Sequence, residues 1–209
     1  MRKVRTFSND KELVLRRRNH IVKIATKLIV KKGYNRINTR ELAAALGMST
    51  GGLYHYIGSK EDILHLIINF ASELPDQTLS TLNKKLKHVA PTKSLIESVK
   101  VYIETVENNR DFLNFINHIM LSLTPGDRKI VYEAESRVVE YFENLLLEGI
   151  EKGEFVALDT RLIANNVVAI ANAWANRGWY LKRYYTLEQY SSEQIETLIS
   201  QISKCQANS

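Results

Sequence analysis

The sequence contains very little cysteine. Among its 209 residues the single cysteine is Cys205, which excludes an intrachain disulfide and a multi-cysteine zinc site. One unpaired cysteine is typical of proteins in a reducing compartment, so we expect a cytoplasmic protein. The basic N-terminal residues are followed by polar residues and not by an apolar stretch, so we expect no signal peptide.

Long hydrophobic runs are also lacking. The most apolar segment, residues 163–175, contains three asparagines and is shorter than the roughly 20 residues that a membrane-spanning helix needs. We therefore expect no membrane span. Strand-like alternation of apolar and polar residues is missing too, as are internal repeats and low-complexity tracts. Helical spacing of the apolar residues dominates instead, so the sequence predicts an all-α fold.

Motifs for catalysis or cofactor binding are scarce. Gly47 to Gly51 match the G-x-S-x-G nucleophile pattern, but that motif needs a strand before the serine, and the preceding residues have a helical pattern. Glu61 and His65 stand four residues apart, yet spacing supplies no third metal ligand. There is no glycine-rich phosphate loop. We therefore expect neither an enzyme nor a bound cofactor or metal.

Charge is abundant and unevenly distributed. The net charge of the chain is +6, but residues 1–60 carry 14 lysines and arginines against three acidic residues, and residues 61–209 carry 15 against 20. The first region therefore has a net charge of +11 and the second of −5. A basic region of this kind attracts a polyanion such as DNA. A solvated basic arm is the alternative that charge alone leaves open.

The segment 38–56 has the pattern of two short helices joined by a tight turn. Asn38 is a good N-cap and Glu41, three residues later, completes a capping box. Gly47 provides a residue that tolerates the left-handed conformation at which the first helix can end. Ser49 can then cap the second helix. The pattern predicts a helix-turn-helix, which places its second helix in the major groove of DNA.

The rest of the chain predicts further helices. The expected segments, in chain order, are residues 11–32, 39–46, 50–56, 60–74, 76–89, 92–108, 110–123, 127–152, 160–184 and 187–204. We expect Ser59 and Asp127 to cap two of them and Pro75 to mark a boundary. The prediction is a three-helix head joined by a helix to a larger helical body, with a DNA-binding domain at 1–74 and an effector-binding and dimerisation domain at 75–209.

The stretch from Ile21 to Ile68 resembles the N-terminal DNA-binding domain of the TetR family of transcriptional regulators. The resemblance is carried by Ala25, Leu28, Gly33 and Tyr34, and then by NTRELAAALGMSTGGLYHYIGSKEDIL. Ile57 stands where the family often has phenylalanine, which exchanges one apolar residue for another. The resemblance implies a homodimer that reads a palindromic double-stranded DNA operator and a body that binds a small-molecule effector.

The resemblance also implies which residues contact DNA. They are Thr39 and Arg40 at the supporting helix, Thr50, Gly51, Gly52, Tyr54 and His55 on the recognition helix, and Tyr56 and Lys60 at the phosphate backbone. Glycine allows close approach, hydroxyls reach phosphates and lysine neutralises them. The recognition helix has no arginine or asparagine for bidentate base contacts, so DNA shape should matter heavily. Leu53 is expected in the core, and Arg16, Arg17 and Arg18 are expected to form a solvated face or to supply charge at a helix start.

The body offers candidate effector contacts. They are Phe112, Phe115 and His118 in one aromatic stripe, and Asn172 and Trp174 on a later helix. A core or surface position is the alternative for His118. The asparagines at 165, 172 and 176 can face a pocket, a dimer seam or solvent. Residues 179–190 resemble a tail found in some family members that respond to acyl-CoA, so the resemblance implies an acyl-CoA or another hydrophobic effector.

Together these features predict a ligand-responsive DNA-binding transcriptional regulator, most simply a repressor that an effector releases from its operator. The alternative is a helical small-molecule carrier or enzyme whose basic head binds a protein. DNA affinity distinguishes the two, since the alternative predicts ligand binding or turnover without it.

Overall fold

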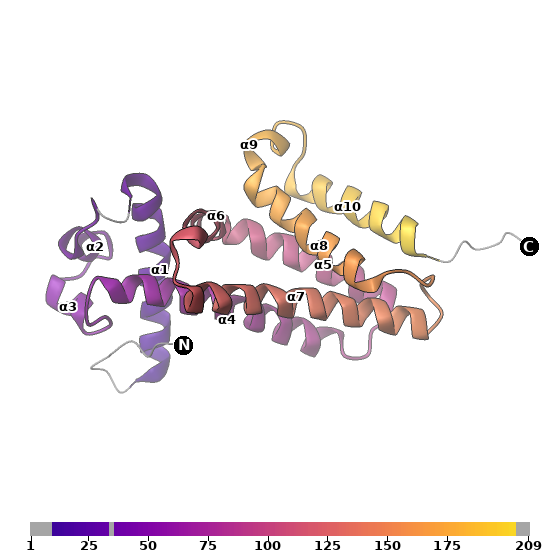
Figure 1. Ribbon diagram of the computed structural model, residues 1–209, viewed down its shortest axis with the longest axis horizontal. Helices are drawn as coiled ribbons and strands as arrows, with labels where there is room; N and C mark the ends of the chain where they lie inside the picture. The colour runs from indigo at the N-terminus through magenta and orange to yellow at the C-terminus, as the bar shows by residue number, and fades with distance from the viewer. Residues whose placement is uncertain (1–9, 34–35, 204–209) are drawn as a thin grey trace, which may run out of the picture. The chain divides into compact units, whose positions relative to one another are not determined.

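A computed structural model describes residues 10–33 and 36–203 (Figure 1). These residues form ten α-helices and a short 3-10 helix, and they contain no strand; an isolated antiparallel bridge joins Phe155 and Ser203. The all-α prediction is confirmed. No helix within the described ranges is long and apolar enough to cross a membrane. Tyr34 and Cys205 lie outside the described residues.

The helices belong to two compact units. Unit 1 contains the described residues up to Leu74 together with Asp111–Glu133, and unit 2 contains Pro75–Arg110 and the described residues from Ala134 onward. Unit 1 is therefore built from two separate stretches of the chain.

Unit 1 begins with the helices of the predicted head. They are α1 (Lys11–Lys32), α2 (Thr39–Ala45), α3 (Thr50–Tyr54) and the first part of α4 (Glu61–Leu86), followed later in the chain by α6 (Arg110–Ile119), the 3-10 helix η2 (Met120–Ser122) and the start of α7 (Pro125–Glu151). One hydrophobic core joins them, and its members include Ile21, Leu42, Leu53, Ile67, Phe112, Phe115 and Val131. Phe70 and Phe112 meet edge to face with ring centroids 4.9 Å apart.

The helix α4 corrects the expected break at Pro75. The helix runs through the proline without interruption, although proline removes one backbone donor from the helix. Pro75 is nevertheless the first residue of unit 2. The proline therefore marks a change of packing partners and not the end of a helix.

The start of α7 also differs from the prediction. Thr124, and not Asp127, is the cap: its Oγ1 accepts from the Asp127 amide at 3.2 Å and donates to the Asp127 carboxylate at 2.8 Å. Pro125 takes the first helical position, where its missing N–H removes no intrahelical bond.

Unit 2 is built around α5 (Pro91–Asn108), which packs against α8 (Thr160–Asn176) and α10 (Leu187–Ile202). The predicted long helix over 160–184 is wrong at its end, because α8 stops at Asn176 and the short α9 (Gly178–Leu181) follows. Glycine at position 178 weakens helix continuation. The second half of α4 and most of α7 complete the unit.

The turn after α7 ties unit 2 together. The Glu154 carboxylate accepts from the Thr92 amide at 2.9 Å and from the Thr92 hydroxyl at 2.6 Å, so it caps the start of α5. These two bonds hold the pKa of Glu154 below its usual value. The Phe155 ring packs on Gly149, where an added Cβ would lie 2.0 Å from the ring. Only glycine leaves room for the ring at this position.

Candidate functional site

The turn between α2 and α3 is built by the predicted caps. Asn38 Oδ1 accepts from the Glu41 amide at 2.8 Å, and Ser49 Oγ accepts from the Gly52 amide at 3.0 Å. Gly47 has a φ of +67°, in the left-handed region that favours glycine. The Glu41 carboxylate pairs with Lys32 of α1. The caps therefore set the start of each short helix, and the ion pair with Lys32 ties α2 to α1.

Two buried side chains anchor α3. Leu53 and Ile57 are both 0% exposed, and Tyr56 packs partly against the same core. The core position predicted for Leu53 is confirmed. The helix is shorter than expected, because it ends at Tyr54, with His55 as its C-cap and Tyr56 in the following turn.

The nine predicted DNA contacts all lie on described elements at or near the surface. Arg40, Gly51, Tyr54 and His55 are exposed, and Thr39, Thr50, Gly52, Tyr56 and Lys60 are partly buried. The hydroxyls of Tyr54 and Thr39 lie 3.4 Å apart. The helices α2 and α3 thus present hydroxyls, the Arg40 guanidinium and the glycine backbone of α3 at the surface, and Leu53 anchors α3 in the core.

Arg18 has a role that sequence reasoning missed. It is partly buried, unlike the exposed Arg16 and Arg17, and its Nε donates to the Tyr56 carbonyl at 3.2 Å. Burial lowers the pKa of its guanidinium, and the nearby Asp62 carboxylate opposes this shift. Arg18 therefore holds the segment that follows α3 and is not part of a solvated face.

Asp62 corrects the predicted cap at Ser59. Its Oδ2 accepts from the amides of Gly58 and Ser59, at 2.8 and 3.1 Å, and its side chain is buried. The helix α4 begins at Glu61. Asp62 at one side and Arg18 at the other fix the turn from Tyr56 to Ser59. The position of Asp62 in the first turn of a helix was a sequence signal for its capping role. The role of Arg18 had no such signal, because it depends on packing between residues distant in sequence.

The five candidate effector contacts are divided between the units. Phe112 and Phe115 are buried in the core of unit 1, and His118 is exposed, as the surface alternative for this histidine predicts. Asn172 is partly buried in unit 2. The two phenylalanines therefore have a packing role in the core of unit 1. The sequence pattern alone did not distinguish this role from ligand binding.

Trp174 is fixed by neighbours in unit 2. It is 2% exposed, its Nε1 donates to Glu107 at 2.9 Å, and its ring lies 4.9 Å from that of Tyr190. Lys182 donates to the same carboxylate at 2.5 Å and lies over the Trp174 ring. The asparagines at 165 and 176 are exposed in the single chain.

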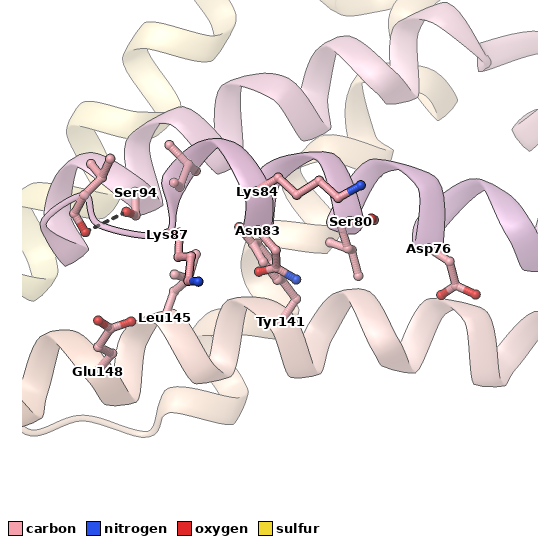
Figure 2. Close-up of a pocket in the computed structure, with 12 residues that line it drawn as sticks. Asp76, Ser80, Asn83, Lys84, Lys87, Ser94, Tyr141, Leu145 and Glu148 are labelled. Atoms are coloured by element: carbon pink, nitrogen blue, oxygen red, sulfur yellow. Dashed lines mark hydrogen bonds between the residues drawn. The ribbon is translucent and has the colours of Figure 1, made fainter.

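A cavity of about 750 Å³ lies in unit 2 between α4 and α7 (Figure 2). Its lining residues are Asp76, Leu79, Ser80, Asn83, Lys84, Leu86, Lys87, Val89, Ser94, Tyr141, Leu145 and Glu148. None of the five candidate effector residues lines it. Leu145 is partly exposed in the lining, while the next residue, Leu146, is fully buried.

Comparison with known proteins agrees with this arrangement. The family profile described as bacterial regulatory proteins, tetR family, matches residues 21–67. A second profile, the tetracyclin repressor-like C-terminal domain, matches residues 88–183. The chain belongs to the TetR family. The chain is thus a DNA-binding transcriptional regulator and not an enzyme.

Individual relatives support the TetR assignment over most of the chain. The HTH-type transcriptional regulator HbdR of Aromatoleum sp. (strain CIB) is 27% identical over 196 residues, which cover 94% of this chain and 85% of the relative. The crystal structure of the TetR-family regulator PfmR from Thermus thermophilus is 26% identical, with a TM-score of 0.70, and the match covers 86% of this chain and 97% of that one.

A further TetR-like structure shares the fold. AibR, solved in complex with isovaleryl coenzyme A and operator DNA, is 24% identical with a TM-score of 0.68 over 88% of this chain and 98% of that one. The helix-turn-helix and the helical body therefore have the fold expected of this family.

Proposed function

We propose that the protein is a homodimeric repressor that binds a palindromic DNA operator and releases it when a small-molecule effector binds. The observation that carries the proposal is the surface of α2 and α3, where the exposed Arg40 and Tyr54 lie with the partly buried Thr39 and Thr50. The buried Leu53 anchors α3 beneath this surface. The net charge of +11 over residues 1–60 supports attraction to DNA. The protein would act in the cytoplasm, where its operator lies.

In this proposal the nine surface residues of 39–60 contact DNA. Tyr54, Thr39 and Thr50 bring hydroxyls to phosphates and base edges, and Arg40 and Lys60 supply positive charge. Gly51 and Gly52 let the backbone of α3 approach the groove closely. Residues 1–74 then serve as the DNA-binding domain with its connecting helix, and 75–209 as the effector-binding and dimerisation domain.

Release from DNA would follow from a population shift. An effector that binds one arrangement of the body more tightly than another favours that arrangement, and the two heads of the dimer then no longer match successive major grooves. AibR, crystallised with isovaleryl coenzyme A and operator DNA, supports an acyl-CoA or another hydrophobic molecule as the class of effector to test first.

Footprinting over the promoter beside the protein's own gene tests the proposal. We expect protection of a palindromic site and a dimer in sedimentation equilibrium, and we expect transcription in vitro to rise when an effector is added. If the protein binds the promoter no more tightly than random DNA, even at low salt, the proposal of a specific operator is wrong.

A further inference from the structure

The carboxylates of the α4–α7 cavity are already neutralised by protein cations. Asp76 of α4 makes a two-bond ion pair with Arg137 of α7, with Nε to Oδ1 at 2.7 Å and Nη2 to Oδ2 at 3.3 Å. Glu148 of α7 pairs with Lys152 one turn later, at 2.6 Å. The acidic groups of the lining are therefore engaged in ion pairs within the protein.

The lysines of the same cavity differ from these acids. Lys84 lies in the last turn of α4, and Lys87 lies in the turn that follows the helix; both line the cavity. Neither has an ion-pair partner among residues 10–33 and 36–203. Lys85, which does not line the cavity, is paired with Glu97 at 2.5 Å. The uncompensated charge of the cavity is therefore positive.

The side chains of Lys87 and Asn83 bring hydrogen-bond donors into the cavity. Figure 2 shows Asn83 of α4 and Lys87 of the following turn extending toward α7, above Leu145 and Tyr141. Lys84 lies along α4 at the edge of the same space. An anionic group beside Lys87 would meet its ammonium group and the Asn83 amide as donors, and Lys84 adds positive charge to the same lining.

The remaining lining is apolar. Leu79, Leu86, Val89 and Leu145 are partly buried side chains that face the cavity. The Tyr141 hydroxyl is engaged with Ser98 at 2.9 Å, so its ring is the part left for contact. The volume of about 750 Å³ lies within the range of roughly 300–1,000 Å³ that small-molecule sites occupy.

We infer that the α4–α7 cavity binds an amphiphilic organic anion, with its acidic group at Lys84 and Lys87 and its apolar part against the leucines. The charge pattern excludes cationic amphiphiles as preferred ligands, because a cation would meet two unpaired lysines and only neutralised carboxylates. The regulatory consequence, that such an anion is the effector, rests on the proposed function.

Calorimetric titration of the full chain with three ligands of equal chain length tests the inference. The ligands are decanoate, decanol and decyltrimethylammonium, each below its critical micelle concentration. We expect decanoate to bind about tenfold or more tightly than the other two, since only it forms charge-assisted bonds. We expect the double variant Lys84→Gln/Lys87→Gln to lose this preference while retaining weak binding of decanol.

Lys85→Gln is the matched control, because it removes a cation from the same last turn of α4 outside the cavity. Equal affinities for the three ligands, or an equal loss of decanoate binding in Lys85→Gln, would overturn the inference. Circular dichroism of each variant establishes that the fold is kept.

Operator binding without ligand separates this inference from the proposed function. We expect the wild type and the double variant to bind operator DNA equally, because Lys84 and Lys87 lie in unit 2 and outside the proposed DNA contacts. Failure of the wild type to bind DNA would count against the proposed function and leave the ligand preference of the cavity intact.

Discussion

In unit 1 the proposed DNA contacts come from one stretch of chain, residues 39–60, whereas in unit 2 the cavity lining comes from residues 76–94 and 141–148. The first surface is held mainly by bonds between near neighbours, such as Ser49 to Gly52. The second exists only where two long helices meet. A local motif can therefore stay the same while the pairing of long helices changes. This suits a protein whose DNA-contacting surface is constant and whose ligand cavity varies.

The largest effect should come from the anchor of the recognition helix. Leu53→Ala removes a side chain that is 0% exposed, so we expect unit 1 to lose about 3 kcal/mol of stability. Thermal unfolding followed by circular dichroism measures the loss. Leu147→Ala in unit 2, where the leucine is 49% exposed, should change stability by less than about 0.5 kcal/mol. Similar losses in the two variants would contradict the assigned burial.

The next effect concerns packing between distant parts of unit 2. Gly149→Ala places a Cβ 2.0 Å from the Phe155 ring, so we expect a loss of about 2 kcal/mol from overpacking. Gly126→Ala, whose nearest neighbour would be 3.9 Å away, is the control and should be neutral or slightly stabilising. A stable Gly149→Ala variant would show that the ring can move aside.

The exposed contacts should affect binding and not folding. Tyr54→Ala and Lys60→Ala should each weaken operator binding about tenfold in fluorescence anisotropy, with the melting temperature nearly unchanged. Lys60→Ala should also lower the slope of the logarithm of the binding constant against the logarithm of salt concentration, by the amount expected for about one lost phosphate contact. Lys100→Ala, exposed on α5, should leave affinity unchanged. Loss of the fold in either head variant would show that a core residue was mistaken for a contact.

Variants of Arg18 and Arg17 distinguish the effect of the Arg18 hydrogen bond on DNA binding from the effect of its charge. Arg18→Gln removes the bond to the Tyr56 carbonyl, so we expect operator affinity to fall about fivefold while affinity for random DNA falls less. Arg17→Gln removes the same charge from an exposed neighbour and should weaken both kinds of binding alike. Parallel losses in the two variants would assign Arg18 to charge alone.

The smallest effect should be a pH dependence in unit 2. The pKa of Glu154 lies below its ordinary 4.5 because Thr92 donates two hydrogen bonds to the carboxylate. The stabilisation of the fold by Glu154 is therefore present above pH 4.5 and is lost as the pH falls through the lowered pKa. We expect the melting temperature of the wild type to fall more than that of Glu154→Gln between about pH 5 and about pH 3, by about 2 °C. Glu104→Gln, exposed on α5, is the control and should follow the wild type.

The sequence predicts the parts of this molecule that short-range chemistry decides. Asn38, Gly47 and Ser49 are caps or turn residues whose partners lie within three or four positions, and the structure confirms each. Leu53 is equally local, because it is the apolar residue of a polar helix. The fold class follows from helical spacing repeated along the chain.

The parts that sequence reasoning missed depend on long-range packing. Arg18 meets Tyr56 across 38 residues, and Glu154 meets Thr92 across 62. Phe112 could not be assigned to the core of unit 1 because no local pattern links it to Phe70. The α4–α7 cavity escaped for the same reason, since spacing shows which residues share a face but not which faces meet.

The division of unit 1 into two stretches has a consequence for synthesis of the protein. The chain is made from its N-terminus, and a nascent segment that ends at Leu74 contains Phe70 but not Phe112, Phe115 or Val131. The head therefore completes its core only after residue 133 has left the ribosome, when part of unit 2 has already been made. An excised fragment of residues 1–74 would expose this apolar surface to water, and the natural unit for expression or transplantation of the DNA-binding head includes the returning segment.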